Sequence, residues 1–455
     1  MTSATSHLTS FAQSMAFLAA LSAIIVTGSL IIESPAAAGQ IFYVSPAGND
    51  ANPGTQENAP WKTIGKAART LLAGDTALLM DGTYTEPEIQ FRNSGTATAP
   101  IIVRARNKHR AILSSTSGCR ANIGVYGSYV TIEGLRSSIA PSNVPCASHN
   151  SSDGTGVRCW PDLSGSKRVS CTIRGMLFDA SPARSHAVKV SQDYTIVEDC
   201  VANSGLEAFN GYGIIFRNNV IIGGDAWGAS LVAKGGVRSF KAYNNLIRIR
   251  SVGGTGIVLG GSTGSQWLYD PSSGIEAYNS VAYNNVVINE SGGATLSLGM
   301  KGARNSMLSN NVVVAGSLFL LPGRSGTLSA NPTIKNNILS CSGQLALAHW
   351  KYSGTMSLDY NDFYNCPGAP SQIHPVVGDP LFINPRSDWH LASGSPAIQS
   401  GTTVTVTGFN AETILVNRDR DNKVRSTPWG LGIYAANPLS SSTAPLAAPS
   451  GIRVP

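Results

Sequence analysis

Ser306-Met-Leu-Ser-Asn-Asn311 is one copy of a short pattern that recurs throughout residues 191–364 of this chain. Each copy has a few alternating apolar residues, a polar pair that usually ends in Asn, and then a second short apolar run. Further copies are Ser239-Phe-Lys-Ala-Tyr-Asn-Asn245, Ser280-Val-Ala-Tyr-Asn-Asn285 and Pro332-Thr-Ile-Lys-Asn-Asn337. The chain is therefore built from a repeated unit.

The spacing between copies decides the architecture. Equivalent polar positions follow one another at steps of 41, 24, 19, 26, 40, 26, 26 and 25 residues. These positions are Gly134, Gly175, Asp199, Asn218, Asn244, Asn284, Asn310, Asn336 and Asn361. A period in the twenties made of short β-runs and turns is typical of stacked coils, and the two steps near 40 are coils that carry an insertion.

Two other repeat architectures are excluded by the pattern. The Leu-x-x-Leu-x-Leu frame of leucine-rich repeats is absent. No helical pattern of about 10–15 residues separates the β-runs, as a barrel of alternating strands and helices requires. The sequence therefore predicts an all-β fold, a right-handed parallel β-helix whose three sheets form a solenoid with strands about 4.8 Å apart.

The polar pairs predict two ladders along this solenoid. The second Asn of each pair should stack in one column at a bend, where we expect it to tolerate a left-handed backbone and to bond its own turn. This column is Asn219, Asn245, Asn285, Asn311 and Asn337. The position before the pair reads Glu133, Arg174, Glu198, Arg217, Tyr243 and Tyr283. Alternating charges on neighbouring coils indicate a salt-bridge ladder rather than a catalytic row.

Composition and charge limit the class of partner. The chain has 455 residues, of which only 13% are charged, and a formal net charge of +7. A moderately basic surface favours an acidic polysaccharide. Nucleic acid is disfavoured because the basic residues are scattered singly, without aromatic interleaving. A single solenoid of this length buries a continuous core, so we expect a monomer without further globular domains.

The seven cysteines show no CxxC pair and no zinc-ligand spacing. Cys341 and Cys366 lie 25 residues apart, which is one coil, and are predicted to bridge adjacent turns. Cys146 and Cys159 are predicted to close an insertion loop. Both bridges require an oxidising compartment.

The chain divides into five predicted segments. They are an export signal at 1–38, a strand, cap and first coil at 39–100, the β-helix at 101–370, a closing segment at 371–437, and a disordered tail at 438–455. The first of these has an apolar run from Ala16 to Ile32 and small residues before Gly39. We expect a secreted or cell-surface protein, and a retained membrane anchor is the alternative for this segment.

A helix is predicted from Trp61 to Leu72. Its apolar residues are spaced for one face, and they are Ile64, Ala67, Ala68, Leu71 and Leu72. The first coil of a β-helix exposes an apolar layer and unpaired strand edges, so we expect this N-terminal helix to cap it.

The ends of the repeat region resemble a known group of proteins. The segments in question are Ile41-Phe-Tyr-Val-Ser-Pro-Ala-Gly-Asn-Asp50, Gly74-Asp-Thr-Ala-Leu-Leu-Met-Asp-Gly-Thr-Tyr84, Gly378-Asp-Pro-Leu-Phe382 and Trp389-His-Leu-Ala-Ser-Gly-Ser-Pro-Ala-Ile398. They are similar to the entry and closing segments of secreted pectate-lyase-like β-helix proteins. The resemblance implies the architecture over residues 40–435 more specifically than an activity, because the same fold serves lyases, hydrolases, epimerases and non-enzymatic proteins.

Several catalytic motifs of related β-helix enzymes are absent from this chain, and their absence limits the type of reaction that the resemblance implies. The Asn-Thr-Asp, Asp-Asp and Gly-His-Gly motifs of polygalacturonase-type β-helices are absent. Glu198-Asp199 is the one adjacent acidic pair in the chain, so the clustered aspartates of calcium-binding pectate lyases are not evident. The resemblance therefore implies a lyase in which a Lys or Arg on a strand is the base and calcium or another basic side chain neutralises the uronate carboxylate.

Register predicts a candidate catalytic site. Lys189 and Lys234 each lie ten residues before their polar pair, which places them in one column two coils apart, and Glu207 lies on the coil between them. Both lysines have apolar sequence neighbours, which favours a lowered pKa and hence a general base. His186 is expected to take part.

Further residues are predicted to bind substrate at the margin of this site. They are Asn210, Asp225, Trp227, Lys301 and Arg304, with Trp227 stacking on a sugar face. If calcium is used, Glu207 and Asp225 are its predicted ligands. Insertions at 138–162 and 260–278, the second with Trp267 and Tyr269, are expected to form loops over the groove.

The sequence favours a lyase acting on an acidic, uronate-containing polysaccharide by β-elimination. Two alternatives stay open at this stage. One is a non-catalytic glycan-binding protein of the cell surface or matrix, and the other is a glycoside hydrolase or epimerase on the same fold.

Overall fold

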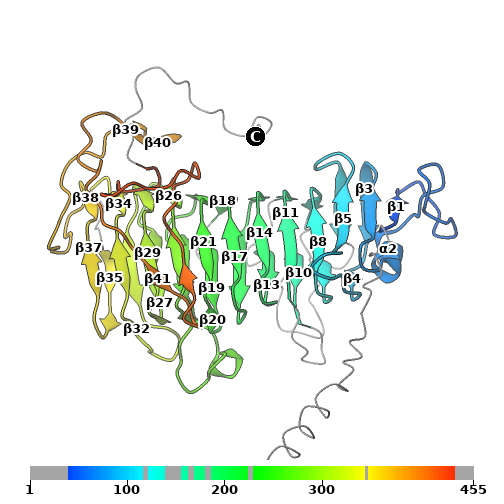
Figure 1. Cartoon of the computed structure of the whole chain (residues 1–455), viewed down its shortest axis with the longest axis horizontal. Coiled ribbons are helices and arrows are strands. Elements are labelled where there is room, and N and C mark those ends of the chain that lie inside the picture. Colours follow the sequence, from blue (N-terminus) through cyan, green and yellow to red (C-terminus); the bar gives the residue numbers. More distant parts are fainter. Residues whose placement is uncertain are drawn as a thin grey trace, which may run out of the picture. The chain divides into compact units, whose positions relative to one another are not determined.

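The computed structural model describes residues 39–115, 121–138, 155–161, 169–179, 186–223, 229–343 and 347–435. Within them the predicted parallel β-helix is confirmed, with three long sheets of parallel strands stacked coil upon coil (Figure 1). We name the 12-stranded sheet A, the 11-stranded sheet B and the 10-stranded sheet C. A fourth, five-stranded sheet of two-residue strands follows sheet C in the later coils and is named the corner sheet.

Each sheet takes one strand from each successive coil. Sheet A contains β1 (Ile41–Val44), β2 (Thr76–Leu79), β5 (Ile101–Ala105), β8 (Val130–Glu133), β11 (Cys171–Arg174), β14 (Ile196–Glu198), β17 (Ile215–Arg217), β21 (Lys241–Tyr243), β25 (Val281–Tyr283), β29 (Met307–Ser309), β33 (Thr333–Lys335) and β37 (Ser357–Asp359). Sheet B contains β3 (Gly82–Glu86), β6 (Ala111–Ser115), β9 (Arg136–Ser138), β12 (Leu177–Phe178), β15 (Val201–Ala202), β18 (Val220–Gly223), β22 (Leu246–Ile249), β26 (Val286–Asn289), β30 (Val312–Val314), β34 (Ile338–Ser340) and β38 (Asp362–Tyr364).

The remaining strands complete the solenoid and its closing segment. Sheet C contains β4 (Ile89–Phe91), β7 (Ala121–Val125), β10 (Thr155–Cys159), β13 (His186–Val190), β16 (Gly205–Phe209), β19 (Ala229–Lys234), β23 (Thr255–Gly260), β27 (Leu296–Lys301), β31 (Leu318–Leu321) and β35 (Leu347–Trp350). The corner sheet contains β20 (Val237–Arg238), β24 (Ala277–Tyr278), β28 (Ala303–Arg304), β32 (Ser329–Ala330) and β36 (Tyr352–Ser353). Two antiparallel pairs lie in the closing segment, β39 (Phe382–Asn384) with β40 (Asp388–Leu391) and β41 (Val406–Thr407) with β42 (Thr413–Ile414).

The core is a set of apolar columns inside the coils. In sheet C one such column is fully buried and comprises Val188, Leu206, Leu231, Ile257, Leu298 and Leu318. Each buried side chain of this kind stabilises the fold by about 1.5–3 kcal/mol relative to an exposed one. Because the pleat alternates, the residues between these positions point outward, and this alternation presents the candidate site.

The predicted asparagine ladder is confirmed. Each buried Asn donates its amide N–H to the side-chain oxygen of the Asn on the next coil, as Asn285 does to Asn311 at 3.0 Å and Asn311 to Asn337 at 3.0 Å. The expected left-handed backbone belongs to the other member of the pair, because Asn310 has a φ of 55° and Asn284 a φ of 53°. The last equivalent position is correspondingly Tyr360, with a φ of 55°, and not Asn361, which joins the ladder instead.

Replacing Asn311 by Leu is expected to lower the free energy of unfolding by about 3 kcal/mol, because buried polar groups on both neighbouring coils lose a partner. The side chain of Asn311 makes four hydrogen bonds, to Asn285 twice, to Asn337 and to the carbonyl of Ala282. Chemical denaturation measures the change. Asn107→Leu is the matched control, since the exposed Asn107 amide contacts only Asp81, and an equal loss in both variants would contradict the ladder's role.

The predicted charge ladder is also confirmed. The Glu198 carboxylate accepts hydrogen bonds from Arg174 Nε at 2.5 Å and from Arg217 Nε at 2.7 Å. Burial alone would raise the pKa of Glu198, but its hydrogen bonds and ion pairs with the two arginines lower it below its ordinary value. Arg217 also donates to the Tyr243 hydroxyl, whose ring stacks on Tyr283. This column is therefore structural.

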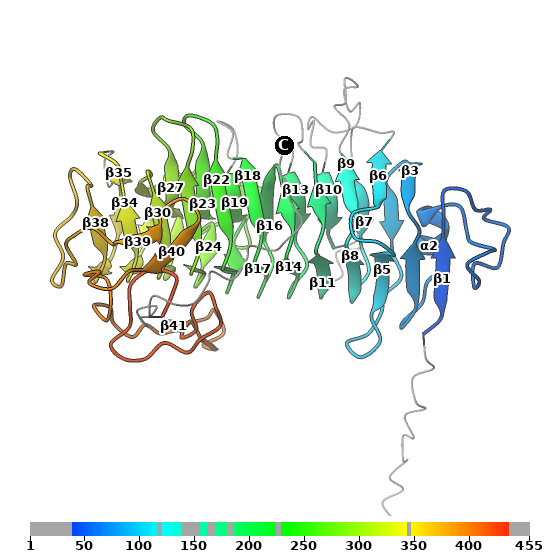
Figure 2. The same cartoon turned by 90° about the horizontal axis from the view of Figure 1, so that it is seen from above.

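The N-terminal cap is shorter than predicted. Helix α2 (Ile64–Thr70) begins after Thr63, whose side chain accepts from the Lys66 N–H. Trp61 is not helical because it forms a parallel bridge to Val44. Ile64, Ala67, Ala68 and Leu71 are buried as expected, and α2 lies at the first-coil end of the stack in Figure 2. Leu72, expected on the same face, is exposed because the helix ends at Thr70.

The closing segment packs against the later coils of sheets A and B. The buried guanidinium of Arg425 donates to Asn284 Oδ1 at 2.9 Å and to the carbonyl of Gly432 at 2.9 Å. Trp389, Leu431 and neighbouring apolar residues cover an outer column of sheet B. This segment thus covers solenoid surface that would otherwise be apolar and exposed. The predicted segment boundaries stay predictions.

One predicted disulfide is confirmed and one is wrong. Cys341 bonds Cys366 across one coil. Cys159 bonds Cys171 instead of Cys146, because β10 ends directly at Cys159 and β11 begins at Cys171. Cys200 carries a buried thiol whose pKa burial raises to about 12, which leaves it unreactive. Cys119, Cys146, the export signal and the tail lie outside the described residues.

Candidate functional site on the outer face of sheet C

Three consecutive coils bring the predicted catalytic residues to one face. On β13, β16 and β19 the flanking residues Val188, Val190, Leu206, Ala208, Leu231 and Ala233 are fully buried in the core. Lys189, Glu207 and Lys234 occupy alternate positions and therefore point outward from sheet C. Their functional roles stay predictions.

Glu207 is the centre of the cluster. Its Oε2 atom lies 2.9 Å from Lys234 Nζ and 3.4 Å from His186 Nε2, and Lys189 is its register partner on β13. Although Glu207 points away from the core, it is only 5% exposed. Burial alone would raise the pKa of this carboxyl, but the charges of His186, Lys234 and Lys189 lower it below its ordinary value. Glu207 is therefore ionised at neutral pH.

The predicted column of lysines is wrong by two residues. Lys189 pairs with Glu207, and Glu207 pairs with Val232, so Lys234 lies one outward position further along β19. The error has a simple cause. The connection from sheet C to sheet A lengthens by one residue per coil, so that Val190, Ala208 and Ala233 lie nine, ten and eleven residues before Asp199, Asn218 and Asn244. The two lysines still share a face.

A loop fixes the position of Lys234. A side chain at Gly261 would meet the Lys234 side chain at 2.8 Å, so the lysine lies directly over this glycine. The buried carboxylate of Glu276 accepts from the main-chain N–H of Thr263 and of Gly235, which ties the loop 260–278 to the end of β19. Trp267 and Tyr269 on the loop are exposed, at 63% and 46%, and the predicted position of this loop over the groove stays a prediction.

A second polar cluster, which was not predicted from the sequence, lies on the same face of sheet C. Arg158, the register partner of Lys189, donates to Glu88 at 3.2 Å and to the Tyr126 hydroxyl at 2.5 Å. The signal was the outward position of Arg158 in Thr155-Gly-Val-Arg-Cys159, but the insertion around it hid the strand. Nearby, the rings of Trp160 and Phe209 stack with their centroids 5.7 Å apart.

The predicted margin residues are only partly brought together. Lys301 is on β27, two strands beyond Lys234, and points outward from sheet C. Arg304 lies on β28 of the corner sheet, above the Tyr278 ring, and so is on a different sheet from Lys234. Asn210 occupies the bend after β16 with a φ of 48° and its N–H donates to the carbonyl of Lys234, which is a structural contact. Asp225 and Trp227 lie outside the described residues.

Calcium does not fit Glu207. The carboxylate is already occupied by the Lys234 ammonium at 2.9 Å and by the His186 ring at 3.4 Å, and the ammonium would repel a cation in the same place. Asp225, the other predicted ligand, is not described. Across the described ranges no three His, Cys, Asp or Glu residues gather as a metal site. No step is therefore assigned to a metal at this site.

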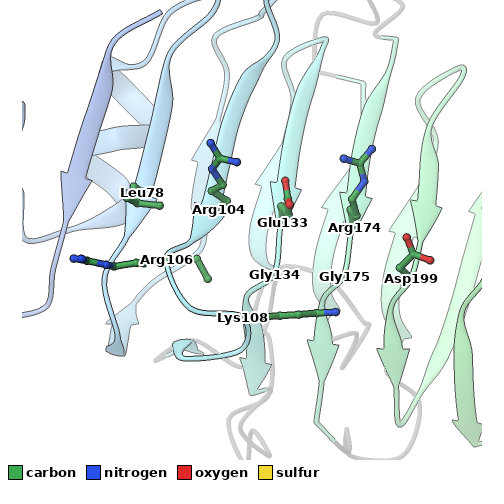
Figure 3. A pocket seen from close by; sticks show the side chains of 10 residues that line it. Leu78, Arg104, Arg106, Lys108, Glu133, Gly134, Arg174, Gly175 and Asp199 are labelled. Carbon is green, nitrogen blue, oxygen red and sulfur yellow. The ribbon is translucent and has the colours of Figure 1, made fainter. Parts of the chain in front are cut away.

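A pocket of about 550 Å³ lies on a different sheet, on the outer face of sheet A. Figure 3 shows Arg104, Glu133 and Arg174 on successive strands, with Lys108 and Asp199 beside them. Arg174 is engaged by Glu198, and Arg106 of the same pocket is engaged by Glu57. Four basic residues and two acidic ones, Glu133 and Asp199, line this pocket.

Comparison with known proteins agrees with the observed architecture. Residues 42–159 match the family described as Pel9A-like, right handed beta helix region. YwoF of Bacillus subtilis (strain 168), an uncharacterized protein, is 27% identical over 217 residues, which cover 42% of this chain and 44% of YwoF. Pectate lyase PEL9 of Emericella nidulans is 41% identical over 80 residues, which cover 17% of this chain and 19% of that protein. The chain thus covers less than half the length of these curated relatives.

Solved structures with related strand arrangements come from more than one enzyme class. Pectate lyase Pel9A is 16% identical, with a TM-score of 0.43, over 87% of this chain and 96% of that one. A GH136 lacto-N-biosidase from Eubacterium ramulus is 14% identical, with a TM-score of 0.45, over 70% of this chain and 68% of that one. Among the described residues, no helix is long and apolar enough to cross a membrane.

Proposed function

We propose that this pectate-lyase-like right-handed β-helix protein is a polysaccharide lyase that cleaves a uronate-containing polysaccharide on the outer face of sheet C. The observation that carries the proposal is the buried carboxylate of Glu207 with Lys234, His186 and Lys189 around it. Two lysines and a histidine against one carboxylate leave excess positive charge on an outward face, which suits an anionic sugar chain. The stacked rings of Trp160 and Phe209 add aromatic surface near the cluster, since Phe209 is the register partner of Lys234.

β-Elimination needs two functions that this cluster can supply. A base removes the proton on the carbon next to the uronate carboxyl, and a positive group stabilises the negative charge that develops on the carboxylate. The bond to the leaving glycosidic oxygen then breaks, and that oxygen takes up a proton. We assign the base to Lys234, which acts as the neutral amine after its ammonium has passed one proton to solvent and which Glu207 and Gly261 hold in place, and we assign the stabilising charge to Lys189.

The described carboxylates do not suit a glycosidase. On the outer face of sheet C these are Glu88, next to β4, and Glu207 on β16. Four strand steps separate β4 from β16, or about 19 Å, whereas the two acids of a glycosidase lie about 5–10 Å apart. A non-catalytic glycan-binding protein remains the rival, and only turnover distinguishes it.

The test is incubation of the purified full chain with pectate, alginate and glycosaminoglycans while the ultraviolet absorbance of the unsaturated product is followed. A lyase gives increasing absorbance with one of these substrates. Binding to a polyanion without any such increase would overturn the proposal in favour of the rival.

Glu207→Gln is expected to lower turnover by about 10–100-fold, because Lys234 loses a charge-assisted hydrogen bond worth about 1.5–3 kcal/mol. Because Lys234 and His186 already occupy this carboxylate, wild type and Glu207→Gln should respond identically to added calcium. Kinetics with calcium and with a chelator measure both effects. A calcium requirement that the substitution abolishes would show that Glu207 is a metal ligand.

The same substitution has a predicted effect on acid stability. Because the pKa of Glu207 is lowered in the folded protein, its ionised form contributes stability that is fully present above the ordinary carboxyl pKa. That contribution is lost as the pH falls through the lowered value. Glu207→Gln should therefore unfold with a weaker dependence on pH below 5, and thermal denaturation across that range checks this.

A further inference from the structure

Asp362 interrupts an apolar column on the outer face of sheet B. The column runs through Val286, Val312 and Ile338, in direct register, before it reaches Asp362 on β38. On the other side Asp362 forms a parallel bridge with Val376 of the closing segment. The closing segment covers this column, so an acidic side chain stands where the three preceding coils place Val, Val and Ile.

The Asp362 carboxyl has no partner in the described structure. The residue is 0% exposed, and neither of its side-chain oxygens accepts a hydrogen bond. A buried, ionised and unpaired carboxylate is costly, and native proteins neutralise such groups by a proton, an opposite charge or an ion. The negative charge of a second carboxylate, that of Asp379, makes ionisation of Asp362 still more costly.

Asp379 is held in a defined position beside this group. Gly378 has a φ of 145° and packs tightly on the ring of Pro396, which fixes the chain just before Asp379. Asp379 Oδ1 accepts the N–H of Leu381 at 2.9 Å, and the charge of the same carboxylate raises the pKa of the Tyr364 hydroxyl. Asp379 itself is exposed, so solvent and ions can reach the pair from its side. Burial, and then the charge of Asp379, raise the pKa of Asp362 to about 8.

We propose that Asp362 and Asp379 bind a divalent, oxygen-preferring cation of the calcium type between the last coil and the closing segment. A proton alone would neutralise Asp362 but would not supply partners for its two buried oxygens. A cation satisfies the buried carboxylate and also neutralises Asp379. Calcium tolerates irregular oxygen shells that main-chain carbonyls and water complete, which suits a site with two carboxylates, whereas zinc favours nitrogen and sulfur ligands.

Such an ion would fasten the closing segment to the end of the solenoid. Val376 and Gly378–Asp379 approach β38 here, and the buried apolar cluster of Trp389 and Leu431 follows along the same face. The site lies on sheet B, away from the face that carries Lys234 and Glu207. It therefore does not depend on the proposed lyase activity.

The test is terbium luminescence of the full chain after removal of divalent ions, with Tyr364 as the nearby sensitiser, followed by displacement with calcium. Wild type should show one saturable site. Asp362→Asn and Asp379→Asn should each weaken terbium binding at least tenfold. Asp359→Asn is the matched control and should bind as wild type does, because that carboxylate is engaged by His374 at 2.8 Å.

The outcome does not rest on one variant. If Asp362→Asn fails to give a native near-ultraviolet circular dichroism spectrum, the exposed Asp379→Asn decides. Absence of saturable terbium binding in wild type, or equal binding in wild type and Asp379→Asn, would overturn the proposal and leave a protonated Asp362 as the explanation. Calcium should also raise the unfolding temperature of wild type but not of either variant, and an equal rise in all three would count against the site.

Discussion

Lys234→Ala is expected to lower turnover of the acidic polysaccharide by about 10²–10⁴-fold, the range that a general base contributes. Binding of an oligosaccharide should change little, because Lys189, Arg158 and the aromatic surface stay in place. The reason is positional. Lys234 Nζ lies 2.9 Å from Glu207 and its side chain rests over Gly261, so a lysine in this place has a fixed position on the outer face of sheet C.

Two further variants separate a base from a binding charge. Lys189→Ala should raise KM by about tenfold, consistent with the loss of one charge-assisted contact, and should change kcat less. Lys241→Ala, on sheet A, is the matched control and should leave both constants unchanged. Full activity in Lys234→Ala would remove Lys234 from the mechanism, while the β-helix assignment would stand.

Removing residues 40–75 is expected to leave aggregated protein in place of a soluble monomer. The deletion takes away β1 and α2, and it uncovers the first layer of the core together with the free edge of β2. Size-exclusion chromatography and the yield of soluble protein measure the result. A soluble, monomeric product would show that the helix does not cap the solenoid.

Two neighbouring point variants test the same cap more sharply. Leu71 is fully buried, whereas Leu72 is 64% exposed. Leu71→Asp should lower the free energy of unfolding by about 4 kcal/mol or more, because it buries an unpaired charge. Leu72→Asp should change it by less than about 0.5 kcal/mol. Similar losses in both variants would contradict the observed packing of α2.

The recurring Asn pairs were sufficient to predict the coils. A column of side chains that repeats once per coil reports a local rule, since every copy meets the same neighbours above and below it. The sequence therefore predicted the β-helix, the asparagine ladder from Asn219 to Asn337, the charge ladder around Glu198 and the Cys341–Cys366 bridge. The period could not decide which Asn of each pair takes the left-handed backbone, because both members are Asn and Asn suits a turn at either position.

The candidate site depends on what the repeat does not determine. The sequence placed Lys189, Glu207 and Lys234 on neighbouring coils. Their register depends on the spacing between sheet C and sheet A positions, which is nine, ten and eleven residues on these three coils. Only the tertiary structure showed that Glu207 pairs with Lys234 and His186, that Arg158 continues the same face, and that Arg304 lies on another sheet. Likewise, the burial of Asp362 arises from a closing segment that returns from a distant part of the chain. Spacing along the sequence determines which residues stack from coil to coil, whereas side-chain contacts across a face depend on turn lengths and on folding back, and these are decided in three dimensions.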